Sequence, residues 1–195
     1  MKKFPLVLLL AFGFVFSASA QTTWTFDKSH TTIGFEVTHL VITTVDGKFK
    51  EYDGTVTTKG DSFDGAQIEF TADVASIDTE NEKRDQHLKA DDFFNAEKYP
   101  KLTFKSTSMK KAGKNKYKLT GDLTIRDKTK RVTLDVTYNG MTKDPWGNTK
   151  AGFKLRGKVN RFDFDLKWNT MTEAGGAVVG KHIDFDINVQ LVKKS

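Results

Sequence analysis

The chain contains no cysteine among its 195 residues. It therefore has no thiol nucleophile and no disulfide bond, so the fold must be held together by core burial alone. A cysteine is also missing near the N-terminal segment, where an exported lipoprotein would carry its lipid. That absence excludes lipid-modified export.

Long apolar segments are missing too, because the longest run, residues 4–16, falls short of the roughly 20 residues that a membrane-spanning helix needs. Lys2 and Lys3 precede this run, and small residues follow it at the spacing that signal peptidase accepts. These features predict a signal peptide, residues 1–20, cleaved after Ala20. The remaining residues, 21–195, are expected to form a single domain that is periplasmic or secreted.

Signatures of catalysis and of metal binding are equally scarce. The four histidines, His30, His39, His87 and His182, lie far apart, and no two have the helical spacing of a metalloprotease pair. The sequence contains no Gly-x-Ser-x-Gly nucleophile elbow and no glycine-rich phosphate loop. It therefore favours neither a metal site nor nucleophilic catalysis, and it predicts no cofactor.

Charge gives little indication of a partner. The formal net charge is +6, and it falls to +4 when Lys2 and Lys3 are removed with the signal peptide. Many basic residues alternate with other residues along a strand, as Lys116 and Lys118 do around Tyr117, which is typical of a solvent-facing side. We expect no nucleic-acid partner and at most transient contact with a membrane.

The mature chain is rich in short segments whose apolar residues recur at every second position, the pattern of strands with one buried face. Short turns join most of them, which favours antiparallel neighbours. Eight such strands in a row predict an all-β fold, an eight-stranded antiparallel up-and-down barrel whose closure removes exposed edges. We expect strands over residues 33–37, 48–58, 68–74, 117–125, 132–138, 153–159 and 183–191 and from residue 102, a short helical or edge segment over 40–45, and a bulge or close-packing point at Gly54.

Phenylalanine is abundant, with 16 residues, and is frequent at the inward-facing positions of these strands. One interpretation is an ordinary packed core. The other is an elongated apolar cavity, because a barrel of eight strands has room either for side chains or for one slender ligand. Under the second interpretation the wall consists of Ile33, Phe35, Ile68, Phe70, Phe104, Leu119, Leu134, Phe153 and Phe185.

Residues 76–100 interrupt the alternation between the third and fourth strands and hold a dense cluster of Arg, His and acidic side chains. We expect a short helix over residues 81–90, capped by Asp78 or Thr79, with Arg84, His87 and Leu88 on one face. Phe93, Phe94 and Tyr99 would pin this insertion to the barrel as a lid. Arg84 and His87 would either pair with Asp85 or Asp92, or contact the polar head of a ligand. A second loop, residues 169–181, contains three glycines and follows Trp168, and it is either a mobile flap at one mouth of the barrel or a long hairpin connection.

Several of these segments together resemble the YceI-like, or polyisoprenoid-binding, family, and the match keeps its order over the whole mature chain. The resemblance implies a lipocalin-like barrel whose interior holds a long isoprenoid or similar amphiphile, often in an exported homodimer. Asp165 and Lys181 depart from the family pattern, which commonly has Gly and an acidic residue there. The matching segments are 24–27, Ser29-His30, Phe35-x-Val37-x-His39, 45–49, 76–79, Arg84-Asp85-x-His87-Leu88, 92–94, Tyr99-Pro100, Gly121-x-Leu123-Thr124-Ile125, Arg161-x-Asp163-Phe164, Trp168-Asn169, Gly175-Gly176 and Val179-Gly180.

Three functions remain in competition on the sequence. The leading hypothesis is a non-catalytic protein that binds, carries or sequesters an isoprenoid lipid or quinone, with the tail in the barrel and the head near Arg84, His87 or Trp168. The alternative is an enzyme that acts on a bound lipid or quinone, with His87 as general base and Arg84 stabilising an anion. The third is an interaction protein with a filled core.

Overall fold

The computed structural model describes residues 21–194, so the predicted signal peptide, residues 1–20, lies outside the described residues. The described chain is almost entirely antiparallel sheet, with short helical segments between strands. Among these residues no helix has the length and apolar character needed to cross a membrane. The elements are β1 Gln21–Phe26, β2 Thr32–His39, β3 Thr43–Phe49, β4 Tyr52–Lys59, β5 Ser62–Asp73, η1 Val74–Ser76, β6 Ile77–Asp78, α1 Glu82–Lys89, β7 Lys101–Gly113, β8 Lys116–Ile125, β9 Lys128–Lys143, β10 Thr149–Asn160, η2 Arg161–Phe164 and β11 Val179–Lys193.

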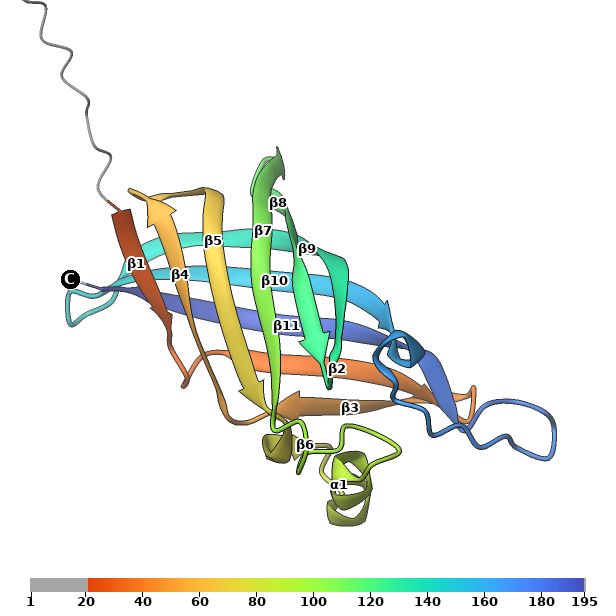
Figure 1. The fold of residues 1–195 in the computed structure, drawn as a ribbon. Helices are drawn as coiled ribbons and strands as arrows, with labels where there is room; N and C mark the ends of the chain where they lie inside the picture. Colours follow the sequence, from red (N-terminus) through yellow and green to blue (C-terminus); the bar gives the residue numbers. More distant parts are fainter. Residues whose placement is uncertain (1–20, 195) are drawn as a thin grey trace, which may run out of the picture.

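The sheet closes into a barrel of eight strands in the order β1-β4-β5-β7-β8-β9-β10-β11, with β11 pairing back to β1 (Figure 1). Its last strand is long enough to have two successive partners on one side. The end of β11 pairs with β1, and its earlier part pairs with β2, which in turn pairs with β3. Two strands of the barrel are therefore interrupted: β1 and β2 together make up one barrel strand, and β3 and β4 together make up the next. The predicted eight-stranded antiparallel barrel is confirmed.

The breaks in these two strands are the main departure from the predicted elements. The expected strand over 48–58 is two strands, because β3 ends at Phe49 and β4 begins at Tyr52. Between them Lys50 N donates to the Ser76 carbonyl and Glu51 N donates to Ser76 Oγ, so the amides of this stretch bond to the start of the insertion, while the Glu51 carbonyl accepts from Asp73 N at the end of β5. The segment over residues 40–45 was expected to be a short helix or an edge segment. Residues 40–42 form a turn and residues 43–45 begin β3, where they pair with β2 alone, so the edge alternative holds for the second half of the segment and the helix is not formed. The strand β1 was not predicted.

Gly54 was expected to mark a bulge or a close approach, and the close approach is confirmed. A Cβ atom built at this position would lie 2.4 Å from the carbonyl oxygen of Glu69 on β5. Any larger side chain there would separate β4 from β5.

The end of the barrel where β1 begins is filled by aromatic side chains. The rings of Trp24 and Phe63 have centroids 5.1 Å apart, and Phe153 packs against Phe63 at 4.7 Å and against Tyr138 at 5.2 Å. The buried indole of Trp24 donates to Thr58 Oγ1 at 3.0 Å, so its polar atom is satisfied. This end of the barrel is a packed core.

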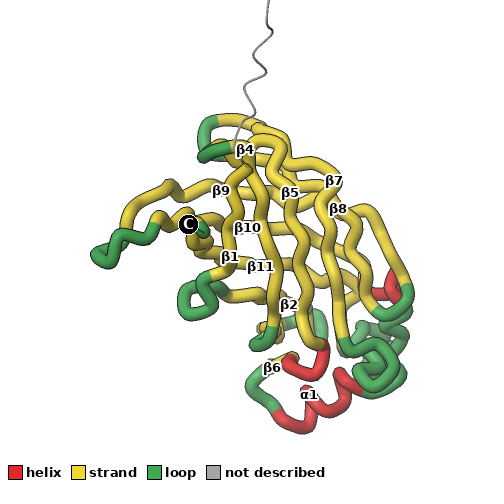
Figure 2. The backbone as a smooth tube through the Cα atoms, turned by 60° about the vertical axis from the view of Figure 1, so that its left-hand side comes forward, coloured by secondary structure: helices red, strands yellow, loops and turns green. Residues whose placement is uncertain are grey.

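The insertion lies across the opposite end of the barrel, where Figure 2 shows the helix α1 in red. Its helix α1 is confirmed, but the predicted cap is wrong: Asn81 is the N-cap, and its side chain accepts from Arg84 N. Asp78 accepts from Glu80 N instead, and Thr79 donates its hydroxyl to Asp85 Oδ1 at 2.6 Å. Glu80 adopts a left-handed conformation, φ 62°, which turns the chain and delays the start of the helix to Glu82.

A polar cluster ties the break between β1 and β2 to the last two strands. Asp27 accepts from Lys150 Nζ at 2.6 Å and from Gln190 Nε2 at 2.9 Å, and it lies 3.1 Å from His30 Nδ1. Burial raises the pKa of Asp27, but the hydrogen bonds from Lys150, His30 and Gln190 outweigh it and lower the pKa to about 2. The cluster stabilises the fold while Asp27 is ionised.

The substitution Asp27→Asn is expected to lower the free energy of unfolding at pH 7 on the order of 1 kcal/mol. The folded-state pKa is below the ordinary value of 3.8, so this contribution is complete above pH 3.8 and is lost as the pH falls toward 2. Urea denaturation of both proteins across this pH range measures it. Asp135→Asn, which removes an exposed partner of Lys118, is the control with an effect near zero. A difference between Asp27→Asn and the parent that is as large at pH 2 as at pH 7 would contradict the assignment.

Candidate functional site

Below the aromatic core the barrel encloses a cavity of 470 Å³ that extends to the insertion. Its wall is almost entirely apolar, because the inward-facing positions of the strands carry Ile, Leu, Val and Phe. The barrel is therefore not filled by its own side chains, which argues against the interaction protein with a filled core. Of the residues predicted for the site, eleven line the cavity: Ile33, Phe35, Ile68, Phe70, Arg84, His87, Phe104, Leu119, Leu134, Trp168 and Phe185.

Phe153 is the exception, and its placement corrects the prediction. Its side chain faces inward as expected, but it belongs to the aromatic core with Phe63 and Tyr138 and does not line the cavity. Alternation along a strand predicts which face a residue occupies, not how far along the barrel it lies. Phe153 therefore belongs to the aromatic core that closes one end of the barrel and is not part of the cavity wall.

Glycines on the inner face make room for two of the wall rings. A Cβ atom at Gly47 would lie 2.3 Å from the Phe35 ring, and one at Gly121 would lie 2.3 Å from the Phe104 ring. Each ring thus lies against the backbone of a neighbouring strand. The two phenylalanines stay close to the wall, and the space along the barrel remains open.

Many further cavity residues were not predicted as site residues. Most continue the alternation of strands that were predicted, so the same pattern could have found them. Others come from the insertion and from segments around η2 and the flap, where no alternation exists. The additional lining residues include Phe26, Val37, His39, Val45, Phe49, Thr79, Lys83, Leu88, Phe93, Phe94, Leu102, Leu123, Ile125, Val132, Leu155, Val159, Arg161, Phe164, Leu166, Val178, Val179, Ile183, Ile187 and Val189.

The helix α1 places Lys83, Arg84, His87 and Leu88 at the cavity, so the predicted shared face of Arg84, His87 and Leu88 is confirmed. Arg84 is held by Thr79: Nε donates to Oγ1 at 2.7 Å and Nη2 donates to the carbonyl oxygen at 2.6 Å. Its guanidinium has a fixed position as a result, at the end of an apolar chamber.

His87 pairs with Asp92, one of the two partners considered for it. Nε2 lies 2.9 Å from Asp92 Oδ2, and both side chains are about half exposed. The imidazole packs edge-on against Phe93 and Trp168, with ring centroids 4.9 and 5.5 Å away. A carboxylate that orients an imidazole could serve proton transfer, but it serves equally to fix the insertion.

Trp168 connects the insertion to the segment that follows η2. Its ring stacks on Phe93 at 5.7 Å, and the amides of Lys167 and Trp168 donate to the Asp92 carbonyl at 3.0 and 3.1 Å. Its own carbonyl accepts from Arg161 Nη1 at 2.6 Å. The cavity therefore has one polar end, formed by Lys83, Arg84, His87, Arg161 and Trp168.

Arg161 is the largest feature of this end that the sequence analysis did not assign. It is 2% exposed. The guanidinium donates only to backbone carbonyls, those of Leu166, Trp168, Val179 and Gly180. Burial lowers its pKa. It fixes both ends of the loop that contains the flap.

A second arginine, Arg126, fastens the insertion to the barrel. It lies in the turn between β8 and β9, and its Nη1 donates to the carbonyls of Asp91, Phe93 and Asp165 at 2.7, 2.7 and 3.0 Å. Its guanidinium also lies 5.4 Å from the centroid of the Tyr99 ring. Phe93, Phe94 and Tyr99 were expected to pin the insertion, and Phe93 and Phe94 do pack on the cavity. Arg126 adds polar contacts to those that Lys50, Glu51, Lys167 and Trp168 make with the insertion.

Asp165 stands where the resemblance implies a glycine, and it adopts the left-handed conformation, φ 58°. Glycine suits such a position because it has no Cβ, and Asp is one of the few other residues that tolerate it. Its carbonyl still reaches Arg126 and its carboxylate lies 3.5 Å from Lys128 Nζ. The departure from the family pattern thus keeps the local backbone.

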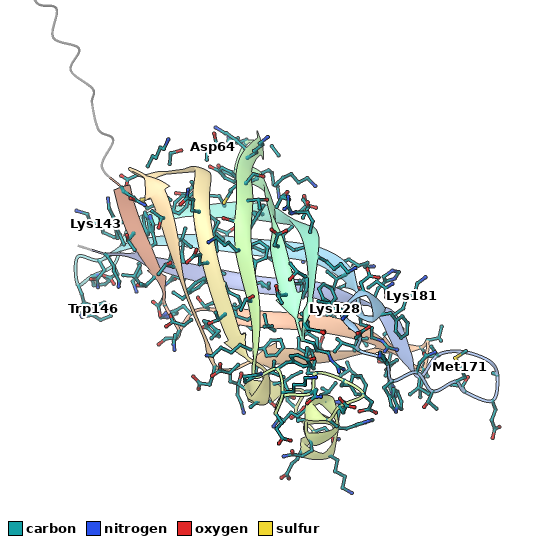
Figure 3. All side chains as sticks on the ribbon, viewed as in Figure 1. Asp64, Lys128, Lys143, Trp146, Met171 and Lys181 are labelled. Atoms are coloured by element: carbon teal, nitrogen blue, oxygen red, sulfur yellow. The ribbon has the colours of Figure 1, made fainter. Side chains whose placement is uncertain are left out.

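The C-terminal end of the flap, residues 169–181, is bound by Arg161 and by the turn between β2 and β3. A single bridge joins Met171 and Ala177, and Leu40 N donates to the Val178 carbonyl, which places the flap beside the turn between β2 and β3. Met171, Val41 and Ile42 are 53%, 66% and 83% exposed. Figure 3 shows Met171 on the protruding loop, far from Trp146 at the opposite end of the barrel. Apolar side chains thus reach solvent next to the cavity mouth.

Taken together, the geometry is suited to holding an amphiphile. The chamber offers apolar contact along its length and cationic groups at one end. His87 with Asp92 is the one arrangement described above that could move a proton at this end.

Comparison with known proteins identifies relatives over nearly the whole chain. The sequence profile of the YceI-like domain matches residues 24–191. A UPF0312 protein of Staphylococcus aureus (strain N315) is 36% identical over 173 residues, which are 87% of this chain and 97% of that protein. A UPF0312 protein of Staphylococcus epidermidis is 37% identical over the same shares.

Solved structures give the same result. A Campylobacter jejuni YceI protein is 37% identical, covers 87% of this chain and 96% of its own, and superposes with a TM-score of 0.70. Burkholderia cenocepacia BcnA is 23% identical with a TM-score of 0.72, covering 85% and 98% of the two chains. A domain of Saccharophagus degradans described as polyisoprenoid-binding is 11% identical with a TM-score of 0.62, covering 88% and 98%. The last two demonstrate a shared fold alone.

Proposed function

This chain belongs to the YceI-like family, and from that premise we propose that it is a binding protein that carries or sequesters a long-chain isoprenoid lipid or quinone, or a similar amphiphile, inside its barrel. The tail would lie along the apolar wall, and the head would lie at the polar end beside Arg84 and His87. The ligand is held without a covalent bond, and no cofactor takes part.

The observation that carries this proposal is the cavity itself. A chamber of 470 Å³ with an almost wholly apolar wall would be costly to leave filled with water, whereas an apolar tail gains about 25 cal/mol for each Å² removed from water. The polyisoprenoid-binding description of the Saccharophagus degradans neighbour agrees with this interpretation, although the likeness to it is one of fold.

Gently purified protein is expected to contain a stoichiometric lipid, seen as a mass shift in native mass spectrometry and identified after solvent extraction. Delipidated protein should then take up added isoprenoid alcohols with an affinity that rises about fourfold for each additional CH2 group, since each buried group contributes about 0.8 kcal/mol. The rise should stop when the tail fills the chamber. Absence of any co-purifying lipid, together with no uptake of an added one, would contradict the proposal.

The second candidate is an enzyme that acts on the bound lipid, and the contact between His87 and Asp92 is the observation in its favour. The substitution His87→Gln distinguishes the binding protein from the enzyme. If the protein only binds, His87→Gln leaves the bound lipid chemically unchanged, as in the parent. Conversion of an extracted or added lipid by the parent, lost in His87→Gln, would establish the enzyme instead.

The cellular location and the oligomeric state of the protein are also proposed. The predicted signal peptide at residues 1–20 supports export to the periplasm or beyond. A homodimer and a transient contact with a membrane at the exposed Val41, Ile42 and Met171 are consistent with an apolar surface beside the cavity mouth. Neither nucleic acid nor a stable membrane anchor is part of this function.

A further inference from the structure

The polar end of the cavity carries charge of one sign. Lys83, Arg84 and Arg161 line it together with His87, which pairs with Asp92, whereas no Asp or Glu side chain is itself among the described lining residues. The absence is selective, because the chain has 25 acidic residues. On the outer wall the basic side chains commonly have acidic partners, as Lys154 has in Asp186.

Of these cationic side chains, Arg161 has the strongest need for a counter-charge, because it is buried. It is 2% exposed, and among residues 21–194 no carboxylate lies within ion-pair distance of it. Its four hydrogen bonds all go to neutral carbonyl oxygens, two from Nη1, one from Nε and one from Nη2. A guanidinium has five N–H donors, so one hydrogen on Nη2 has no acceptor in the described chain. A buried cation without a counter-charge is unfavourable, and an anion in the cavity would neutralise it.

Arg84 offers a second cation in a fixed position. Nε and Nη2 are bound to Thr79, which leaves Nη1 without a hydrogen bond among the described residues. The neighbouring carboxylate of Asp85 does not pair with Arg84: it accepts from the amide and the hydroxyl of Thr79. Asp85 thus orients Thr79 and makes no direct ion pair with the arginine.

We infer that the ligand is an acidic amphiphile whose head is an oxyanion, a carboxylate or a phosphate, neutralised by Arg161 and Arg84. This inference rests on the proposed function and specifies the class of its ligand. Arginine suits either head, because its planar fork of donors matches the oxygens of both. A neutral head, such as an alcohol, would accept a hydrogen bond but would leave both charges uncompensated.

The experiment compares three ligands with the same C20 tail, namely geranylgeraniol, geranylgeranoic acid and geranylgeranyl phosphate. Displacement of the neutral dye Nile red from delipidated protein at pH 7 reports each affinity. At least one of the two anions is expected to bind tenfold or more tightly than the alcohol, and the two acidic ligands distinguish carboxylate from phosphate. Equal affinities within twofold for all three would overturn the inference and leave the proposed function intact. If none of the three binds, the proposed function itself fails.

Substitution locates the effect. Arg84→Gln is expected to reduce the affinity for the anion at least fivefold more than it reduces the affinity for geranylgeraniol. Lys158→Gln, which removes an exposed cation on the outer wall, is the matched control and should change neither. Arg161→Gln should abolish the remaining preference, but it also removes bonds that hold the flap, so its folding is checked by circular dichroism. An equal loss for anion and alcohol in Arg84→Gln would show a merely structural role and contradict the inference.

Discussion

Leu134→Trp is expected to reduce the affinity for an isoprenoid alcohol by about fiftyfold while the barrel remains folded. Leu134 lies on β9, is buried and lines the cavity. An indole at this position would occupy space that about three CH2 groups of a tail would otherwise fill, and each of those contributes about 0.8 kcal/mol. Displacement of Nile red measures the loss.

Folding is expected to survive this substitution because the added volume has a cavity to enter. Extra atoms in a close-packed core usually cost about 1–3 kcal/mol, since neighbouring side chains must move. Here we expect a change in the free energy of unfolding below about 1 kcal/mol in the delipidated protein. The matched control is Thr133→Trp, which places the same ring one residue away on the exposed face of β9 and should leave binding unchanged. Normal binding by a folded Leu134→Trp protein would mean that the ligand lies elsewhere.

The barrel could be predicted from the sequence because its strands follow one rule over long distances. Apolar positions recur every second residue, and this parity identified eight of the nine wall residues proposed from the strands as cavity residues. Arg84, His87 and Trp168 were proposed from the insertion and the segment before the flap, where no such alternation exists. Parity does not indicate the position of a residue along the barrel axis, and for that reason Phe153 was wrongly predicted to line the cavity. The break between β3 and β4 could have been predicted from the sequence. Phe49 and Tyr52 are three positions apart, so on one continuous strand their side chains would face opposite sides of the sheet, yet both are buried.

The cationic end was harder to predict because it depends on residues outside the strands. Arg161 continues the inward parity of Phe153, Leu155 and Val159 on β10, so an arginine in a buried row was visible in the sequence. Arginine is almost never fully buried, and the ordinary expectation for such a residue is a solvent-facing position. Its acceptors are carbonyls of the loop that follows, and a backbone carbonyl has no residue type that a sequence pattern could reveal. The contacts of Arg126 with the insertion were hidden for the same reason.

The attachment of the insertion leads to the second large effect, because Arg126 determines whether that end of the cavity stays covered. Arg126→Met is expected to increase the rate of ligand release by about tenfold to a hundredfold. Three carbonyls lose their shared donor, and hydrogen bonds from a charged donor contribute about 1.5–3 kcal/mol. Methionine keeps much of the length of the side chain and, like arginine, has a Cβ at this left-handed position, φ 56°, so the substitution adds no new backbone strain.

Stopped-flow mixing of loaded protein with excess lipid vesicles measures that rate. Arg131→Met on the same hairpin removes an exposed arginine that pairs with Asp122, and because exposed ion pairs contribute little, its release rate should stay within about twofold of the parent. The result also separates the two candidate gates. If the ligand leaves past the insertion, weakening its attachment accelerates release. If it leaves past the flap, whose ends are held by Arg161, Arg126→Met releases at the parental rate and the gate lies between Trp168 and Val179.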